Sequence, residues 1–569
     1  MQATVAESWE IPQAGNARWF VHLLPSLTDF AFLLPSFILF FILPGTSVLF
    51  GDGDTGWQIR TGDWILQNRS LPRTDFFSFT KPGEAWFAWE WGADVALAFA
   101  HQAAGLRGVA FLTVLLLGLI SALLFRLIRR ASDNDFLAFG FTLLAICGSI
   151  VHWLARPHLF TWLFALVFSH AILAAERGNR KPLFWLPLVM LLWTNLHGGF
   201  FVGIALLLAS VAGAALEAWM RNQDIAADAY RAVRPYLLCA LACCAVTFVN
   251  PYGWRLHQHV LSYLLDSKLL DSIQEYQSPN FRQPGAAFVE CMLLLGIAAG
   301  FWCMRRRKYA AALTLLLWAH LSLVSIRNVP IFLLLAAPSM ASMSQDALER
   351  ARSLPSLRSR KSGVLADIAR EFRPLEHIER WHVASVLAMA LLAFALASGR
   401  PGFEGRFNPK NFPVAALSSL RAAQPSRLFT SDQWADYLLY QFFPSQRVFM
   451  DDRSDFYGYE FVTKYQHIMN AQHDWEQDLQ QFSIDAVLVE PDAAIASVLK
   501  QSAKWKILAD GGSFILFQKD ERMRQGQAAT PPTGGTIPAL RHEMAGNTLG
   551  PVQQTILVRL PKLNERRSS

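Results

Sequence analysis

The sequence predicts a polytopic α-helical membrane protein that carries a small α/β domain after its last membrane span. Only 17% of the 569 residues are charged, whereas soluble proteins usually carry about a quarter. Uncharged apolar runs of about 20 residues recur, which is the length that a bilayer core requires. Beyond about residue 399 these runs give way to short strand-like segments, so the chain changes architecture there.

The apolar runs predict about eleven transmembrane helices between residues 29 and 398. The first is too long and lies too far from the terminus to be a cleaved signal peptide. Residues 92–105 are too short to span a bilayer and predict an interfacial helix. The predicted spans are 29–50, 106–127, 136–154, 158–175, 182–196, 199–219, 235–249, 286–304, 309–326, 328–343 and 382–398.

The distribution of Lys and Arg predicts the orientation. Loops after even-numbered spans are basic, as in "RLIRRASDND", "ERGNRK" and "MRRRK", whereas "ARPH", "NLHGG" and "SIRN" are nearly free of Lys and Arg. Since basic loops stay inside, segments 1–28 and 344–381 are predicted to be cytoplasmic. Loops 51–105 and 250–285 and region 399–520 then face outward. The net charge of +7 is therefore a topology signal and does not indicate nucleic-acid binding.

The region 399–520 predicts a small extracytoplasmic α/β domain. The segments "SRLFT", "RVFMD", "AVLVEP" and "FILFQK" predict strands, with helices at 432–442, 459–471 and 493–502. Residues 521–569 are rich in Gly, Pro and Thr and predict a flexible tail. Ligand contacts in α/β folds tend to follow strand ends, which makes Asp451, Asp452, Arg453 and Asp455 candidates. Turn chemistry explains Asp455 equally well.

The first outer loop opens with "GDGDTGWQIRTGDWIL", residues 51–66. Thr55 and Gln58 match a capping box, which predicts a helix that continues to about Asn68. Two interpretations of Asp52 and Asp54 carry equal weight. Either the acids favour a helix N-terminus, with tryptophans at the membrane interface, or they handle an anionic lipid-linked substrate as a general base or through a divalent cation.

Other outer loops add polar groups near the membrane edge. In "TNLHGGFF", Asn195 and His197 precede a glycine pair that allows close approach of a ligand or another helix, although a lone His is more often structural. The 250–285 loop contains Glu275, Tyr276 and Arg282 and otherwise predicts an interfacial helix.

Two further arginines lie at the outer ends of spans, against the inside bias. Arg156 precedes Pro157, and Arg327 precedes Asn328. A guanidinium matches a phosphate through two hydrogen bonds, so Arg327 is a candidate for holding a lipid-linked phosphate. A salt bridge to one of the loop acids is almost equally plausible.

The order of these segments resembles a group of bacterial polytopic membrane proteins. The resemblance rests on "DTGWQIRTGDWIL", "LPRTDFFSFT" and "WFAWEWGADV", then on "NLHGGF", "NPYG", "EYQSPNF", "RNVPIF" and "VFMDDRSDFYG". It covers residues 52 to 520. That group in turn resembles the GT-C superfamily of integral-membrane glycosyltransferases.

The resemblance implies an inverting glycosyl transfer from a polyprenyl-phosphate-linked sugar to an extracytoplasmic acceptor. It implies an essential acid in the first outer loop, here Asp54, with Asp52 and Glu90 as further candidates and a divalent cation, Mg²⁺ or Mn²⁺, at Asp54. The group is expected to have His where this chain has Gln58 and Trp89. The remaining assignments are a donor-phosphate set of Arg327, Arg156, His197 and Arg282, and a substrate-binding set of Trp57, Arg60, Asn195, Glu275 and Tyr276.

Two other classes of protein remain open. The first is a non-catalytic membrane scaffold whose C-terminal domain binds a protein partner. The second is a transporter for a lipid-linked saccharide, which is disfavoured because the chain shows no internal repeat and almost no acids inside its spans. No phosphate loop, dinucleotide fingerprint, GxSxG elbow or HExxH motif occurs. The predicted partners are the polyprenyl-phosphate sugar lipid and membrane lipids and, in the scaffold interpretation, a protein that binds the C-terminal domain.

Overall fold

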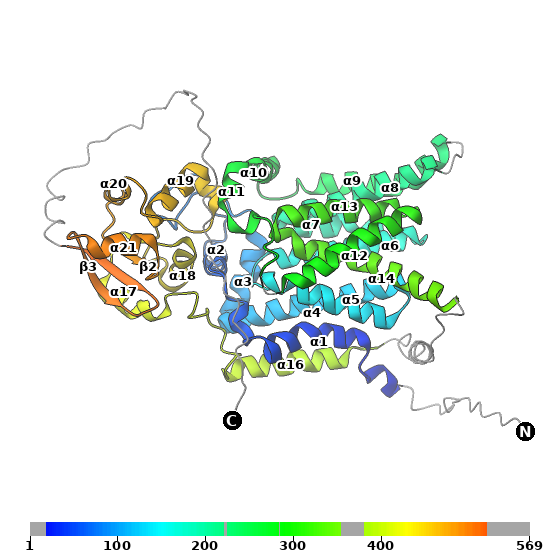
Figure 1. Ribbon diagram of the computed structural model, residues 1–569, viewed down its shortest axis with the longest axis horizontal. Coiled ribbons are helices and arrows are strands. Elements are labelled where there is room, and N and C mark those ends of the chain that lie inside the picture. Colours follow the sequence, from blue (N-terminus) through cyan, green and yellow to red (C-terminus); the bar gives the residue numbers. More distant parts are fainter. Residues whose placement is uncertain (1–18, 221–224, 284, 354–379, 521–569) are drawn as a thin grey trace, which may run out of the picture.

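The structure is a computed structural model that describes residues 19–220, 225–283, 285–353 and 380–520. Within these ranges seven helical segments are long and apolar enough to cross a membrane, so the chain is a multi-pass membrane protein. Their main helices lie side by side in one bundle (Figure 1). These are α1 (Leu27–Phe37, extended by η2, Ile38–Ile42), α4 (Leu106–Ser132), α5 (Asp135–Ser149), α6 (His158–Glu176), α8 (Phe201–Met220), α12 (Ala286–Arg305) and α14 (Val329–Ser353).

The other four predicted spans are also helical but fall short of that criterion. Three of them are shorter than a bilayer requires: α7 (Leu186–Leu196) has 11 residues, and α13 (Tyr309–Val324) and α16 (Val383–Ser398) have 16 each. The fourth, α9 (Ile225–Val246), has 22 residues but includes Arg231 and Arg234. Thus eleven helices follow the predicted order, and seven of them meet the length and hydropathy requirement.

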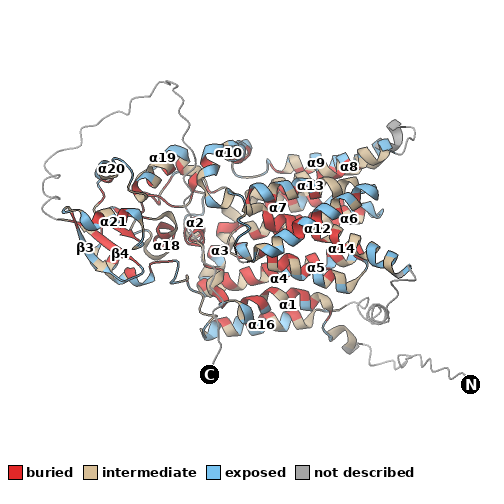
Figure 2. Cartoon of the chain, in the orientation of Figure 1, coloured by how far each residue is buried: buried red, intermediate tan, exposed pale blue. Residues whose placement is uncertain are grey.

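The interior of the bundle is packed around α4 and α14. In the most apolar windows of their spans, 61% and 67% of residues are buried, more than in the other spans. Helices at the rim show buried residues on one side and exposed apolar residues on the other, as a lipid-facing surface requires (Figure 2). Short helical turns connect these helices: η1 (Trp19–Leu23), η3 (Gly45–Val48), η4 (Ile150–His152), η5 (Lys181–Trp185), η6 (Gly198–Phe200) and η8 (Ile326–Asn328).

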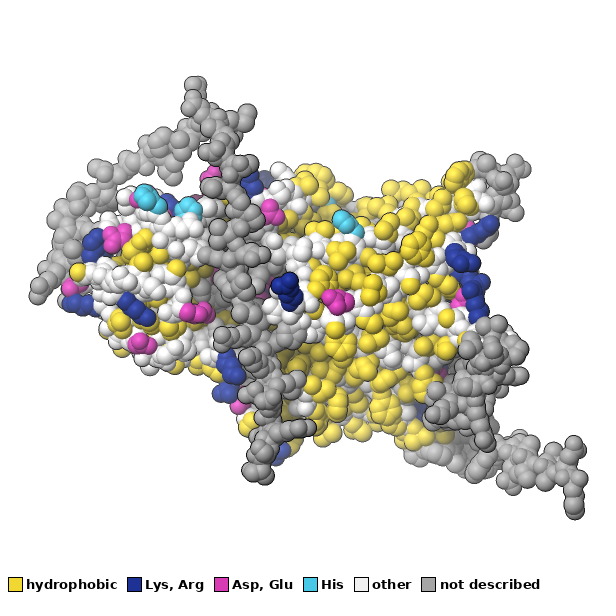
Figure 3. All heavy atoms as spheres, in the orientation of Figure 1, with side chains coloured by type: hydrophobic (Ala, Val, Ile, Leu, Met, Phe, Trp, Pro, Cys, Tyr) yellow, Lys and Arg dark blue, Asp and Glu magenta, His cyan; other side chains and the backbone are white. Residues whose placement is uncertain are grey.

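The two ends of the bundle differ in chemistry. The face in Figure 3 is apolar over the bundle, and Lys and Arg gather at the end opposite the C-terminal domain. At the other end lie the helices of the outer loops: α2 (Asp54–Asn68), α3 (Trp91–Ala104), α10 (Trp254–Leu265), α11 (Ser267–Ser272) and η7 (Gln274–Tyr276) (Figure 1). The predicted interfacial helices in these two loops are confirmed as helices.

The start of α2 differs from the predicted capping box. The helix begins at Asp54, and Thr55 Oγ1 donates to the carbonyl oxygen of Ala155 at 3.1 Å instead of capping. Asp52 Oδ1 accepts the Asp54 N–H at 2.8 Å. The prediction that Trp57 anchors the loop in the membrane interface is also wrong, because Trp57 is buried in a cluster that includes residues of the C-terminal domain.

The C-terminal domain contains a four-stranded sheet in the order β1-β2-β4-β3. β1 (Leu428–Thr430) pairs parallel with β2 (Ala486–Val489), and β4 (Ile515–Lys519) pairs antiparallel with both β2 and β3 (Trp505–Asp510). Its helices are α17 (Leu417–Ala423, preceded by η10, Val414–Ala416), α18 (Asp432–Phe442), α19 (Ser454–Met469), α20 (Trp475–Gln481) and α21 (Ala494–Gln501). The sequence correctly predicted three strands, but β3 and α20 were not predicted.

The segment 447–451, predicted as a strand of this sheet, lies elsewhere. Val448 forms an isolated parallel bridge with Ser78 of the first outer loop, through hydrogen bonds of 3.0 Å from Phe79 N to Val448 O and from Val448 N to Phe77 O. The prediction of a strand here is therefore wrong, because the segment forms one isolated bridge and joins no sheet. The domain is therefore joined to the outer loop by its backbone as well as by side chains.

Candidate functional site

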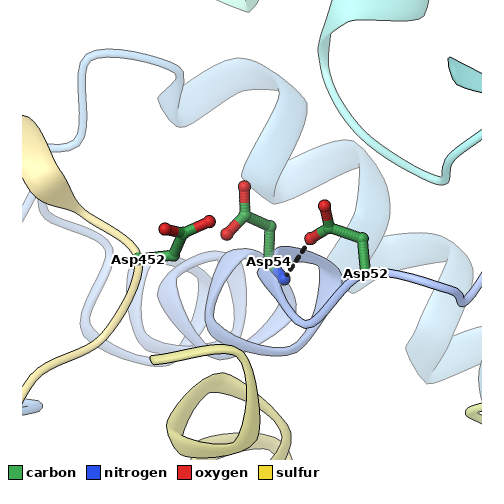
Figure 4. Close-up of side chains that lie close together, drawn as sticks. All are labelled: Asp52, Asp54 and Asp452. Atoms are coloured by element: carbon green, nitrogen blue, oxygen red, sulfur yellow. Dashed lines mark hydrogen bonds between the residues drawn. The ribbon is translucent and has the colours of Figure 1, made fainter. Parts of the chain in front are cut away.

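Three carboxylates from two distant parts of the chain meet where α2 begins. Asp52 and Asp54 flank the helix start, and Asp452 reaches them from the segment between α18 and α19 (Figure 4). One oxygen of each lies within 4.8 Å of the others. Asp54 is 3% exposed. The sequence placed Asp52 and Asp54 together but gave no sign that Asp452 joins them.

Arg156 partly neutralises the negative charge of this cluster. Its Nη1 lies 2.9 Å from Asp52 Oδ2 and 2.7 Å from Glu275 Oε1, and its Nη2 pairs with Asp54 Oδ2. The side chain is 12% exposed. A salt bridge to a loop acid was one of the two interpretations of Arg327, which lies 3.6 Å from Glu275, and Arg156 forms such pairs with three acids.

Two glycines let the C-terminal domain approach this helix start closely, and the side-chain amide of Gln433 holds it there. A Cβ at Gly53 would collide with Gln433 O, and one at Gly56 with Asp436 O, so only glycine permits this approach of α18. Gln433 Oε1 accepts the Gly53 N–H at 2.8 Å, and its Nε2 donates to Asp452 Oδ2 at 3.0 Å. Gln433 thus fixes Asp452 relative to the start of α2.

The acids outnumber the cations here. Burial raises the pKa of Asp52 to about 7 in spite of Arg156. Burial and then Asp54 raise the pKa of Asp452 and that of Asp436 well above their ordinary value. Among the described residues no Lys or Arg forms an ion pair with Asp452 or Asp436, and Asp436 Oδ2 is buried without a hydrogen-bond partner. Such a site favours an added positive charge.

Glu275 and Tyr276 connect Arg156 with Arg327. Arg327 Nη1 donates to the Tyr276 hydroxyl at 3.0 Å and lies 3.6 Å from Glu275 Oε2. Burial alone would raise the pKa of Glu275, but Arg156 and Arg327 outweigh burial and hold that pKa below its usual range. These four predicted residues form one continuous ionic group with Asp52 and Asp54.

His197 and Glu90 form a neighbouring pair. His197 Nδ1 accepts from Gly199 N at 2.9 Å and contacts Thr161 Oγ1 at 2.8 Å, so its Nε2 carries the hydrogen and lies 3.4 Å from Glu90 Oε1. Burial lowers the pKa of His197 to about 3 and raises that of Glu90 to about 8. His197 is therefore a neutral hydrogen-bond donor at pH 7. The predicted close approach at its glycine pair is confirmed, since a Cβ at Gly198 would collide with the Trp89 ring.

Four predicted substrate or donor residues lie in other contacts. Asn195 Oδ1 accepts from Trp91 Nε1 at 3.1 Å, and its Nδ2 donates to two backbone carbonyls. Arg60 donates to Tyr440 O at 3.0 Å from Nε, and Trp57 Nε1 donates to Asp54 Oδ1 at 3.2 Å. Arg282 is exposed, and among the described contacts none joins its guanidinium to the cluster. Of these four, only Trp57 touches the acids.

The candidates of the C-terminal domain separate into three groups. Asp451 and Arg453 are buried in an ion pair with Asp75 of the first outer loop, Asp452 joins the acidic cluster, and Asp455 Oδ2 pairs with His259 Nε2 at 2.8 Å. The prediction that Asp451 and Asp452 end a strand of the sheet is wrong, because the preceding segment bridges to Ser78 instead. Their partner is the outer loop, not a sheet edge.

The sequence analysis missed two residues at the site. Gln433 holds Asp452, and His152, in η4, is buried with neither ring nitrogen hydrogen-bonded among the described residues. The position of His152 four residues before Arg156, at the outer end of a span, was the available signal.

The acidic cluster suits a hard divalent cation. Asp52, Asp54 and Asp452 offer carboxylate oxygens, the ligands that Mg²⁺ and Mn²⁺ prefer. The buried and unpartnered Asp436 Oδ2 and the excess of acids point the same way. The donor set therefore fits the predicted cation, with Asp452 added to Asp54.

No protein-family model matches the chain, and no curated protein matches it in sequence. Solved structures of other proteins do align with its fold. The apo oligosaccharyltransferase of Archaeoglobus fulgidus aligns with a TM-score of 0.49 at 12% identity, over 82% of this chain and 69% of that one. The oligosaccharyltransferase AglB of the same organism, in complex with an inhibitory peptide and a dolichol-phosphate, gives 0.48 at 11% identity, over 89% and 74%. ArnT from Cupriavidus metallidurans, bound to undecaprenyl phosphate, gives 0.41 at 14% identity, over 88% and 98%.

Proposed function

We propose that the chain is a membrane glycosyltransferase that moves a sugar from a polyprenyl-phosphate-linked donor to an extracytoplasmic acceptor. One observation carries the proposal. At one end of the bundle a group of acids, Asp52, Asp54 and Asp452, lies beside a pair of arginines, Arg156 and Arg327, and Arg156 contacts both. Transfer from a phosphate needs a proton acceptor and a cationic phosphate site next to each other.

The acidic half handles the acceptor in this proposal. Asp54 is oriented by Trp57 Nε1 and by Arg156, so its carboxylate has a fixed position from which to accept a hydroxyl proton or to orient the acceptor. Asp52 and Glu90, with raised pKa values of about 7 and about 8, are further proton carriers near neutral pH. Attack on the face opposite the leaving phosphate inverts the anomeric centre.

The cationic half handles the leaving polyprenyl phosphate. Arg156 and Arg327 offer planar guanidinium groups at the bundle end, and charge stabilisation there is the main source of rate. Beside this site, α10 exposes Trp254 and Leu265, 61% and 80% exposed, which suit contact with membrane lipid. The lipid-linked donor follows from the resemblance, and this arrangement supports it. His197, being neutral, contributes a hydrogen bond rather than a charge.

A divalent cation held by Asp52, Asp54 and Asp452 belongs to the proposal. When bound, it supplies positive charge that polarises a substrate oxygen and relieves the repulsion among the acids. The C-terminal domain then forms one wall of the site, a role that requires no protein partner. We place this end of the bundle outside a bacterial plasma membrane, because Lys and Arg gather at the other end.

The test is binding and turnover of a polyprenyl-phosphate sugar by the purified full chain, wild type against Asp54→Asn, with and without Mg²⁺ or Mn²⁺. We expect the wild type to release polyprenyl phosphate and Asp54→Asn to bind donor without turnover. Asp492→Asn, at an exposed position, is the matched control. If Asp54→Asn turns over donor like Asp492→Asn, the role of Asp54 is wrong. If neither binds donor, the scaffold becomes the better interpretation.

A further inference from the structure

Glu275 occupies a position between two arginines that suits a phosphate. Its Oε1 lies 2.7 Å from Arg156 Nη1, and its Oε2 lies 3.6 Å from Arg327 Nη1. One carboxylate therefore spans both guanidinium groups. A phosphate, with several charged oxygens, can accept from two guanidinium groups at once, and arginine is the side chain best matched to it.

Glu275 can leave this position without unfolding the bundle. Its side chain is 28% exposed, and it belongs to η7, a single turn at the end of the outer loop. Two backbone contacts hold that turn to the neighbouring span. Ser325 Oγ donates to Glu275 O at 2.9 Å, and Ile326 N donates to Gln277 O at 2.9 Å. The carboxylate is thus the main ionic link between the outer loop and the arginines.

His152 supplies an unused donor at the same place. It is 7% exposed, and neither ring nitrogen has a hydrogen-bond partner among the described residues. The charged groups that act on it are Glu275, Arg327 and Arg156. Buried polar side chains are nearly always hydrogen-bonded, so an unpaired imidazole beside two arginines indicates a ligand that arrives later.

We propose that Glu275 holds the place of a phosphate in a pocket formed by Arg156, Arg327 and His152, and that an incoming phosphate displaces it. The phosphate then takes both guanidinium groups and accepts a hydrogen bond from His152, while η7 separates from the arginines and the Tyr276 hydroxyl gives up its hydrogen bond from Arg327. This inference rests on the proposed function for the arginines and adds two roles: His152 is a third phosphate ligand, and Glu275 is an internal competitor. The ligand of this pocket is a phosphate group, carried either by a phosphate monoester or by free inorganic phosphate.

If Glu275 competes with phosphate, replacing Glu275 should strengthen phosphate binding rather than weaken it. Removing the charge of Glu275 leaves the pocket open, so Glu275→Gln should bind phosphate more tightly than the wild type. If the open pocket is populated at about one part in ten, the gain is about tenfold. His152→Gln should bind more weakly by a similar factor. A residue with a purely structural role weakens binding when it is replaced and does not strengthen it.

The experiment measures binding of inorganic phosphate and of a polyprenyl phosphate to the full chain in nanodiscs. Wild type, Glu275→Gln and His152→Gln are compared with Glu460→Gln and His473→Gln, which change exposed residues of the C-terminal domain. Glu275→Ala provides a second test of competition. Hydrogen exchange in residues 273–277 and 325–327 should increase on adding phosphate to the wild type, because η7 is released.

The outcomes separate this inference from the proposed function. Tighter binding by Glu275→Gln and weaker binding by His152→Gln support the pocket. If only inorganic phosphate behaves this way and no variant binds the lipid, the pocket stands and the lipid donor is wrong. If the lipid binds equally to the wild type, Glu275→Gln and Glu275→Ala, the competition is wrong although the donor stands. If His152→Gln binds like His473→Gln, His152 is not a ligand.

Discussion

Two arginines, one buried and one partly buried, hold carboxylates at the junction of the bundle and the C-terminal domain, and their surroundings differ. Arg453 is 2% exposed and pairs with Asp75 at 2.6 Å and Asp451 at 2.7 Å, both fully buried. Its guanidinium also stacks near Trp86, at 4.4 Å, and near Phe77 and Phe456, at 5.0 Å each. Two acids and an aromatic enclosure thus surround this arginine, although its Nη1 is buried without a hydrogen-bond partner among the described residues.

Arg156 lies among more acids and fewer aromatics. It pairs with Asp52, Asp54 and Glu275, while Asp452 and Asp436 nearby have no cationic partner among the described residues. Its side chain is 12% exposed. The difference shows how a structural ion pair and a candidate site can be distinguished: in one, both acids are paired with a buried arginine among aromatic rings, whereas the other includes acids that have no cationic partner among the described residues.

The largest effect that would distinguish the two arginines is expected from a substitution at Arg156. Arg156→Lys keeps the charge but loses the fork that reaches three carboxylates, so we expect release of polyprenyl phosphate to fall about 10²–10³-fold with little change in the thermal unfolding midpoint. Steady-state turnover and a thermal unfolding curve measure the two effects. Arg447→Lys, at an exposed position, should change neither. Full turnover in Arg156→Lys would remove Arg156 from the phosphate site.

The opposite pattern is expected at Arg453. Arg453→Met leaves the buried Asp75 and Asp451 without their cation, although they keep other hydrogen bonds, and breaking such a buried ion pair costs about 3–5 kcal/mol. We expect a large drop in the thermal unfolding midpoint and faster protease cleavage near residues 399–410, where the chain enters the domain. The triple change Arg453→Met, Asp75→Asn, Asp451→Asn should recover much of the loss, because it removes the unpaired charges. If Arg453→Met alone is as stable as the wild type, this pair does not hold the domain.

The contribution of the C-terminal domain to the cation is tested at Asp452. Asp452→Asn should raise the Mn²⁺ concentration for half-maximal turnover about 10–100-fold, because it removes one of three carboxylates. It should not destabilise the fold, since Asp452 has no cationic partner to lose among the residues that the structure describes. Asp492→Asn is again the control. An unchanged Mn²⁺ response would show that the domain only closes the site and provides no ligand.

Much of this architecture was predictable because it depends on local patterns. Apolar length placed all eleven helices in order, and the Lys and Arg bias predicted which loops share an end. Asp52 and Asp54 were named from the sequence, and they meet in one ionic group with four other predicted residues, Arg156, Arg327, Glu275 and Tyr276. Charged residues at the ends of spans are energetically unfavourable, so they stand out in the sequence as candidates for a functional site.

The remainder depends on contacts between distant segments. Val448 could pair with β1 of its own domain or with Ser78, and nothing in "RVFMD" decides between them. The approach of α18 to Gly53 and Gly56 brings Gln433 and Asp452 to the site, although 380 residues separate Gly53 from Gln433. The capping-box error has a similar origin, since Thr55 found a partner in Ala155, 100 residues away.

The smallest expected effect tests whether Arg156 fails to neutralise the negative charge of the acids around it. Asp52 has a pKa of about 7 in the folded chain against an ordinary 3.8, so between about pH 4 and pH 7 the folded state keeps a proton that the unfolded state has lost. The stability of the wild type should therefore fall as pH rises through this window. Asp52→Asn removes that fall, so its thermal unfolding midpoint should exceed that of the wild type by a few degrees above pH 7 and match it near pH 4. Asp492→Asn should follow the wild type at every pH. A midpoint for Asp52→Asn below that of the wild type at pH 8 would mean that the ion pair with Arg156 outweighs burial, and the two arginine networks would then be more alike than their surroundings indicate.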